Sequence, residues 1–196
     1  MVKIGFAVEG SCERIILKSP AFQAFLVKQS IEQVGDIVDM VGKGNLKPNT
    51  QKRHMEIQVQ GFRDLGAEWI IVLRDLDEAA SAEAISRVKA EVYRDSDIVV
   101  CLAIHELEAW FLADTGVLST LFGSPFYHEY PETVPKPFDY ISEQKYRKTG
   151  KGLNNKKIFA KFMRNNGFSI ERAAGHPNCP SARYFLNKLQ TLASAN

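Results

Sequence analysis

Residues 70–78 have the sequence Ile-Ile-Val-Leu-Arg-Asp-Leu-Asp-Glu, in which four apolar residues are followed by alternating carboxylates. Such an apolar run is typical of a strand that is buried on both faces of a parallel sheet. Asp75 and Asp77 would then follow the carboxyl end of this strand. Because strand side chains alternate, we expect both carboxylates to face one point, where their repulsion favours a divalent cation or a shared proton.

The segments around this stretch alternate between strand and helix patterns. The expected strands are residues 2–8, 37–41, 70–75 and 97–103, and the expected helices are residues 19–34, 49–65, 81–94, 104–114, 154–165 and 181–193. The alternation predicts an α/β fold, a doubly wound sheet of about four parallel strands with helices on both faces and right-handed crossovers.

A segment with four prolines, residues 123–139, interrupts this pattern. We take it as the start of a second region. The predicted organisation is an α/β domain at residues 1–122 and, at residues 123–196, a proline-rich loop followed by a basic helical extension packed on the domain.

Composition places the chain among soluble globular proteins. Its 196 residues are 45% apolar, the N-terminus has no signal-peptide pattern, and no apolar stretch approaches the ~20 residues that span a bilayer. We therefore expect a cytoplasmic protein without membrane contact. Its three cysteines are far apart, which argues against a disulfide framework and against a four-cysteine zinc site.

Charge is distributed unevenly along the chain. The net charge of +2 combines +9 for residues 140–196 with −7 for residues 1–139. An acidic sheet region beside a basic tail suits a protein that holds cations at one place and polyanions at another, although a solvated charged face explains the tail equally well.

Acidic residues follow three of the expected strands. In open α/β sheets ligands bind beyond the carboxyl ends of the strands, and the candidates there are Glu9, Glu13, Asp75, Asp77, Glu106 and Glu108. Oxygen ligands of this kind suit Mg²⁺ or Mn²⁺ and the chemistry of phosphoryl transfer or phosphodiester cleavage.

Each of these residues also has a purely structural explanation. The two aspartates fit the cap of the helix that follows at Ser81, and Glu13 fits the first turn of a helix, where the dipole favours a carboxylate. The glutamates after the fourth strand fit a solvated helix face. It is the agreement of all three segments on one edge of one sheet that favours a site.

Two motifs resemble the signature motifs of the Toprim domain of topoisomerases, bacterial primases and overcoming-lysogenization-defect (OLD) nucleases. They are Val-Glu-Gly-Ser-Cys-Glu at residues 8–13 and Asp-Leu-Asp at residues 75–77, and the form Glu-Gly-x-x-Glu is closest to the nuclease branch. Residues 103–114 and 178–182 resemble a stand-alone bacterial Toprim-like family that is often encoded beside an ATPase of the ABC/OLD type. The Toprim part covers roughly residues 1–115.

The resemblance implies a role for each matching residue. Glu9 would be a metal ligand or general acid/base, and Asp75 and Asp77 the principal Mg²⁺ ligands. Glu13 would be the second catalytic glutamate, and Glu108 the acidic residue after the fourth strand. The chain departs from these families in three ways. It has no tyrosine placed like the nucleophile of a topoisomerase, and it has no zinc-binding or helicase-binding region of a primase. It also has no Gly-x-x-x-x-Gly-Lys-Ser/Thr motif and hence no ATPase motor, so a separately encoded ABC/OLD-type ATPase is the expected partner.

The basic tail holds the candidate nucleic-acid contacts. Residues 145–164 contain no acidic residue, and the contacts that we expect there are Lys148, Lys151, Lys156 and Lys157. Lysines neutralise phosphates of DNA or RNA, while a solvated face or a partner-protein surface remains the alternative. A lysine close to the acidic residues would also stabilise developing negative charge, and Lys156 is our choice for it.

The sequence thus predicts a Mg²⁺- or Mn²⁺-dependent nuclease, in the setting of a defence or mobile-element system with a partner ATPase. The alternative is a non-catalytic Toprim-like subunit that binds nucleic acid or regulates an ATPase. A metal-dependent phosphatase or nucleotidyl transferase is a third possibility.

Overall fold

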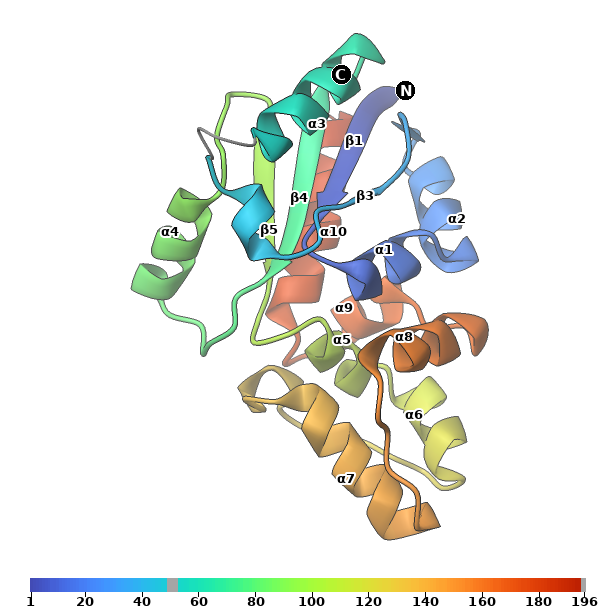
Figure 1. Cartoon of the computed structure of the whole chain (residues 1–196). Coiled ribbons are helices and arrows are strands. Elements are labelled where there is room, and N and C mark those ends of the chain that lie inside the picture. The colour runs from blue at the N-terminus through green and yellow to red at the C-terminus, as the bar shows by residue number, and fades with distance from the viewer. Residues whose placement is uncertain (49–52, 195–196) are drawn as a thin grey trace.

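The computed structural model describes residues 1–48 and 53–194 and has an α/β fold built on one parallel sheet (Figure 1). Its strands are β1 (Val2–Val8), β2 (Ile31–Gln33), β3 (Val38–Asp39), β4 (Trp69–Asp75) and β5 (Ile98–Ala103). The strand order is β2-β1-β4-β5, and β3 pairs with the carboxyl-terminal part of β1. The predicted α/β class with a parallel sheet is therefore confirmed, whereas its Toprim character stays a prediction.

Helices cover both faces of the sheet and form most of the chain after β5 (Figure 1). They are α1 (Ser11–Leu17), α2 (Pro20–Lys28), α3 (His54–Asp64), α4 (Ala82–Glu91), α5 (Glu108–Ala113), α6 (Thr115–Phe122), α7 (Pro137–Thr149), α8 (Lys156–Asn165), α9 (Ile170–Gly175) and α10 (Pro180–Ser194), with 3-10 turns η1 (Lys43–Leu46) and η2 (Pro131–Thr133). The hydroxyl of Ser19 accepts a hydrogen bond from the Phe22 N–H and caps α2, as its sequence position suggests.

Helices pack directly on the central strands of the sheet. Val72 and Leu73 of β4 are fully or almost fully buried, which explains the apolar run in the sequence. In β1, a Cβ atom at Gly5 would lie 2.5 Å from the Cγ atom of Phe62 on α3. The glycine therefore lets α3 pack closely against the sheet.

Two expected helices have different bounds in the structure. Residues 19–34 do not form one helix, because the chain turns at Ser30, whose φ of 57° is left-handed, and Ile31 enters β2. The apolar residues of this segment belong partly to the buried face of α2 and partly to β2. Together they imitate the spacing of one long helix, so periodicity alone gave the wrong assignment. The helix expected at residues 104–114 begins only at Glu108, after a turn in which His105 has a φ of 54°.

Other expectations were incomplete. The strand expected at residues 37–41 is only two residues long, and α6, α7 and α9 were not expected at all. The proposed helix cap at Asn49 lies outside the described residues, and α3 begins at His54.

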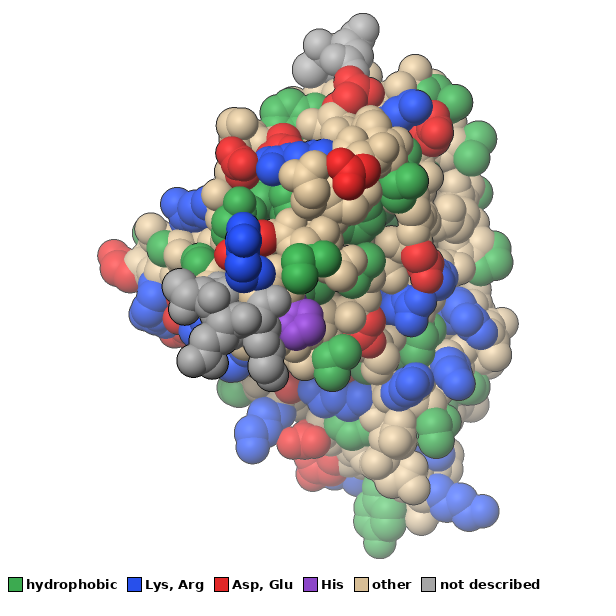
Figure 2. Space-filling view, turned by 45° about the horizontal axis from the view of Figure 1, so that its top comes forward, with side chains coloured by type: hydrophobic (Ala, Val, Ile, Leu, Met, Phe, Trp, Pro, Cys, Tyr) green, Lys and Arg blue, Asp and Glu red, His purple; other side chains and the backbone are tan. Residues whose placement is uncertain are grey.

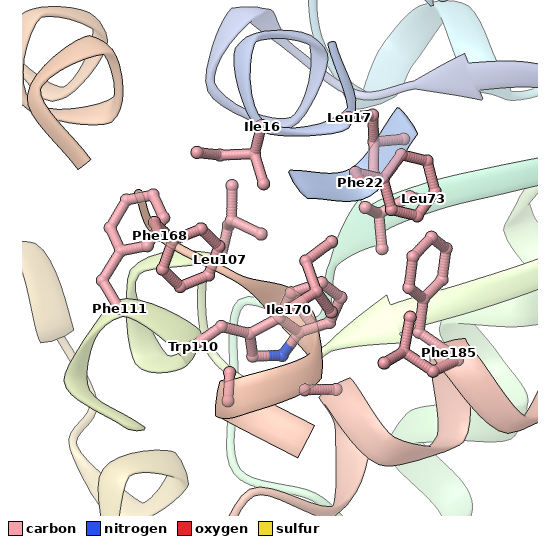
Figure 3. Packing of buried hydrophobic residues seen from close by; sticks show 14 of the residues in the cluster. Ile16, Leu17, Phe22, Leu73, Leu107, Trp110, Phe111, Phe168, Ile170 and Phe185 are labelled. Atoms are coloured by element: carbon pink, nitrogen blue, oxygen red, sulfur yellow. The ribbon is translucent and has the colours of Figure 1, made fainter. Parts of the chain in front are cut away.

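The larger hydrophobic core joins the sheet to the carboxyl-terminal helices (Figure 3). Trp110 of α5 is fully buried, and its ring centroid lies 5.6 Å from that of Phe185 on α10. Phe185 in turn stacks on Phe22 of α2 at 5.8 Å. A second core lies between the opposite face of the sheet and helices α3 and α4.

A buried carboxylate ties the proline-rich segment to α10. The Oε1 atom of Glu132 in η2 accepts hydrogen bonds from the Ser181 N–H at 3.0 Å and the Ser181 hydroxyl at 2.5 Å. The Ser181 Oγ atom accepts the indole N–H of Trp110 at 2.7 Å. These bonds connect η2, α10 and α5 into one network, while the division of the chain at residues 122 and 123 stays a prediction.

In the described part of the chain, no helix combines the length and the apolar character needed to cross a bilayer.

The predicted division at residues 122 and 123 can be tested by truncation. A chain of residues 1–122 lacks α10, which contributes Phe185 and Leu189 to the core that also holds Trp110. Loss of each such side chain costs a few kcal/mol, out of about 5–15 kcal/mol for a whole domain. We expect the truncated chain to show no cooperative urea transition and little near-ultraviolet circular dichroism. A cooperative transition close to that of the full chain would contradict this.

Candidate functional site

The loop after β1 brings two glutamates to the carboxyl end of the sheet. The Glu9 N–H donates to the Leu73 carbonyl at 3.0 Å, which places Glu9 beside the end of β4. Glu13 lies in the first turn of α1, and its Oε2 atom accepts the Gly10 N–H at 3.1 Å. The spacing Glu-Gly-x-x-Glu therefore makes a helix-capping turn whose two carboxylates lie close together.

Asp75, the last residue of β4, connects the strand to the next part of the site. Its Oδ1 atom accepts the Leu107 N–H at 2.8 Å. Leu107 immediately precedes α5, whose first residue is Glu108. This hydrogen bond holds the start of α5, and with it the buried Glu108 side chain, at the end of β4.

These carboxylates share one cavity. The cavity has a volume of about 180 Å³, and its lining includes Glu9, Cys12, Glu13, Asp75, Glu108 and Lys156. The structure thus brings together both glutamates of the first motif, the first aspartate of the second motif and the acidic residue after β5.

Burial and mutual repulsion disfavour the charged forms of these groups. Burial, followed by the charges of Glu13, Glu108 and Glu9, raises the pKa of Asp75 well above its ordinary value. Burial is also the largest cause that raises the pKa values of Glu13 and Glu108 to about 7. A cavity of this kind attracts protons or cations.

Lys156 brings one positive charge into the cavity from the carboxyl-terminal extension. It is the first residue of α8, and its Nζ atom lies 2.7 Å from Glu106 Oε1 and 3.8 Å from Glu108 Oε2. Burial lowers the pKa of Lys156, but the charges of Glu108 and Glu106 outweigh this effect and raise it. The sequence-based choice of Lys156 as the lysine near the acidic residues agrees with this position.

A second cation, Arg74, lies beneath the site and was not identified from the sequence. Arg74 is 1% exposed, and its guanidinium lies 3.6 Å from Glu9 Oε2 and 3.6 Å from Glu91 Oε2. Burial raises the pKa of Glu9, and the charge of Arg74 is the largest effect that opposes the rise. The signal was present in the sequence, because an arginine that continues a buried apolar run requires an anionic partner.

Asp77 does not have the position that strand alternation predicts. The strand ends at Asp75, and Asp77 has a left-handed backbone with a φ of 66°. Its exposed side chain forms an ion pair with Lys43 at 2.8 Å. Asp77 therefore lies at the rim of the site, on the side of Glu9, and outside the set of residues that line the cavity.

The acidic set has the donor chemistry of a Mg²⁺ or Mn²⁺ site. Buried oxygens of Glu106 and Glu108 have no hydrogen-bond partner among the described residues, and neither has Glu9 Oε2, which faces the Arg74 guanidinium at 3.6 Å. Such oxygens can accept a cation as a ligand. No group of three His, Cys, Asp or Glu side chains within residues 1–48 and 53–194 is arranged to hold a metal ion directly. The assignment of the metal ligands therefore stays a prediction.

The other three lysines expected to contact nucleic acid lie outside the cavity. Lys148 donates to the Ser124 hydroxyl at 2.7 Å and lies 5.3 Å from the ring centroid of Phe122. Lys151 and Lys157 are exposed, and Lys157 follows Lys156 on α8. Lys and Arg side chains occur over much of the lower half of the face in Figure 2.

The chain was compared with protein-family models, with curated proteins and with solved structures, and none of the three comparisons returned a match.

The raised pKa of Glu108 predicts how stability depends on pH. Between its ordinary value of 4.5 and about 7, the folded state holds a proton that the unfolded state has released. The free energy of unfolding should therefore fall as pH rises through this window. At about pH 8, Glu108→Gln should raise the free energy of unfolding by about 2–3 kcal/mol, because the variant avoids the cost of ionising Glu108 in the folded state; the effect of Lys156 is already contained in that pKa.

Urea unfolding of the variant and of the wild-type chain at about pH 5 and about pH 8 gives the two free energies of unfolding that are compared. Folded Glu108 keeps its proton at the lower pH and has released it at the higher pH. Glu83→Gln is the matched control, because Glu83 is exposed in the first turn of α4. Equal changes in the two variants, or a stability that rises between the two pH values, would contradict the prediction.

Proposed function

We propose that this chain is a metal-dependent nuclease that cleaves phosphodiester bonds with Mg²⁺ or Mn²⁺. The observation that carries the proposal is the single cavity in which Glu9, Glu13, Asp75 and Glu108 meet Lys156. Several carboxylates with raised pKa values and one nearby ammonium are suited to a substrate that is anionic and binds through a divalent cation.

The carboxylates would supply the cation ligands. Glu9 and Asp75 come from neighbouring strands, Glu13 from α1 and Glu108 from α5, so they approach the cavity from different elements. Asp77 at the rim would act through water or after a change of backbone conformation. The bound cation would neutralise the phosphate and lower the pKa of an attacking water.

The residues of the chain also have direct tasks. Lys156 would place its ammonium beside a non-bridging phosphate oxygen and stabilise the charge that develops during cleavage. Glu13 or Glu108, whichever does not hold the cation, would accept a proton from the water, since a carboxylate with a pKa near 7 is an effective base at neutral pH.

The extension would hold the nucleic acid. Lys156 and Lys157 are consecutive in the first turn of α8, so one reaches the cavity and the other reaches solvent beside it. Lys151 and Lys148 continue the basic surface along the loop before α8 and the end of α7. A strand of DNA or RNA bound along this surface would present a phosphate to the cavity. The defence setting and the ABC/OLD-type ATPase partner belong to the same proposal and derive from the family resemblance.

Cleavage assays with graded variants test the proposal. Purified protein should cleave DNA or RNA oligonucleotides with Mn²⁺, and Asp75→Asn should lower the rate by about 100-fold or more, because Asp75 lines the cavity. Asp77→Asn should lower the rate by about tenfold at most, because Asp77 lies at the rim. In calorimetric titration with Mn²⁺, Asp75→Asn should lose more affinity for the ion than Asp77→Asn.

Three outcomes separate this proposal from the alternatives. Nucleic-acid binding without cleavage, unchanged in Asp75→Asn, would favour a non-catalytic binding or ATPase-regulating subunit. Turnover of nucleotides or small phosphate esters, but not of polymers, would favour a phosphatase or nucleotidyl transferase. Equal losses in the two aspartate variants would overturn the graded roles that we propose for them.

Salt dependence tests the basic surface. Lys151→Gln and Lys157→Gln should each weaken oligonucleotide binding and reduce the slope of log affinity against log salt by about 0.7–0.9, the value for one phosphate contact. Fluorescence anisotropy over a series of salt concentrations gives the slope. Lys28→Gln is the control, because exposed Lys28 lies on α2 and pairs with Glu171 at 3.6 Å. An equal change in the control would contradict the prediction.

A further inference from the structure

The last strand of the sheet, β5, has an open edge. In the strand order β2-β1-β4-β5 it pairs only with β4 among the described strands (Figure 1). The Leu76 N–H donates to the Ala103 carbonyl, and backbone groups of a parallel strand face its neighbour at every second residue. The N–H and C=O groups of Val100 and Leu102 therefore face away from β4, in the direction from which a further strand would pair.

A groove follows this edge between α4 and α10. Two adjoining cavities of about 250 and 330 Å³ share Lys89 and Tyr184, and together they run from Ile98 to Ile104 of the β5 segment. The first is strongly apolar, with Ile85 of α4, Leu102 and Ile104 in its lining. It has room for one large apolar side chain beside Leu102 and Ile104, which are themselves 5% and 6% exposed.

The rim of the groove is basic. Lys89, Arg94 and Lys188 line the second cavity, and its acidic lining residue, Asp95, is engaged by Arg63 at 2.6 Å. The Nζ atom of Lys89 donates to the Tyr184 hydroxyl at 3.4 Å and lies 4.9 Å from its ring centroid. This contact links α4 to α10 across the groove, so a bound strand would have to replace it. Lys89 of α4 and Lys188 of α10 stand on either side of the β5 edge, where positive charge discourages pairing with an identical edge. A second copy of this chain would place like charges together, whereas an acidic segment would meet opposite charges.

We propose that the β5 edge binds an extended, acidic segment of a partner protein by strand addition. The partner's backbone would pair with Val100 and Leu102, one large apolar side chain would enter the cavity at Leu102 and Ile104, and acidic side chains would contact Lys89 and Lys188. This surface is separate from the carboxylate cavity, and the proposal does not depend on nuclease activity.

A pair of synthetic peptides tests the proposal on the full chain. One peptide alternates valine and glutamate around a central phenylalanine, and the other has lysine in place of glutamate. In fluorescence anisotropy the acidic peptide should bind more tightly. The double variant Lys89→Glu, Lys188→Glu should weaken it by about fivefold to tenfold, as expected for two partly exposed charge pairs, and should improve binding of the basic peptide.

Two controls exclude simpler explanations. The double variant Lys28→Glu, Lys136→Glu makes the same charge change at exposed positions away from the groove and should bind the acidic peptide like wild type. Thermal unfolding verifies that both double variants are folded. Amide hydrogen exchange, measured by nuclear magnetic resonance, should slow at Val100 and Leu102 when the acidic peptide is bound.

Equal affinity for the two peptides, no loss in the Lys89→Glu, Lys188→Glu variant, or unchanged exchange at Val100 and Leu102 would overturn the proposal. A dimer in sedimentation velocity whose formation protects these same amides without peptide would assign the edge to a second copy of this chain, and would overturn it as well.

Discussion

The hydrogen bond from the Leu107 N–H to the Asp75 carboxylate fixes the geometry on which the candidate site depends. It joins the end of β4 to the turn before α5, so that Glu108 cannot move away from the strand ends without breaking it. The same short helix carries Trp110, which is buried against α10. A polar contact at the site and the largest buried side chain of the core therefore position the same six-residue helix.

A concentration of carboxylates in one cavity requires positive charge nearby. The chain provides two cations, one buried and one partly exposed. Arg74 lies below Glu9 and is almost completely buried, whereas Lys156 is half-exposed and approaches from α8. The Arg74 guanidinium lies between Glu9 and Glu91, which suits a structural partner. The ammonium of Lys156 has the length and the exposure to exchange its carboxylate partners for a phosphate, so of the two cations it is the one suited to a role with substrate.

The sequence was informative wherever a local pattern decides the outcome. The apolar run of β4, the parallel alternation and the capping serines of α2 and α4 follow from short stretches of chain. The assembly of Glu9, Asp75 and Glu108 at one edge follows from the rule for ligand sites in open sheets. The position expected for Asp77, facing the same point as Asp75, was wrong. Side chains alternate only as far as the strand extends, and β4 ends at Asp75, before the left-handed backbone of Asp77.

Other features depend on contacts between distant segments, which one sequence does not reveal. Nothing near Glu132 indicates that its carboxylate accepts hydrogen bonds from Ser181, forty-nine residues later. The end of α2 at Lys28 also depends on a distant contact. The chain is extended at Ile31, where a helix was expected, because Ile31 pairs with Val2 of β1. Domain bounds are the hardest case, since a proline-rich segment can separate two units or, as here, connect helices that share one core with the sheet.

The candidate site and the β5 edge meet at one short connection. The Asp77 N–H donates to the His105 carbonyl at 2.9 Å, and the His105 N–H donates to the Glu78 carbonyl at 3.3 Å. Ala80, a few residues further along the same loop, lines the apolar cavity beside β5. A ligand in that cavity would thus contact the loop whose other end carries Asp77, the one motif aspartate that lies at the rim of the site. The two surfaces are distinct, and the loop at residues 76–80 is the connection that they share.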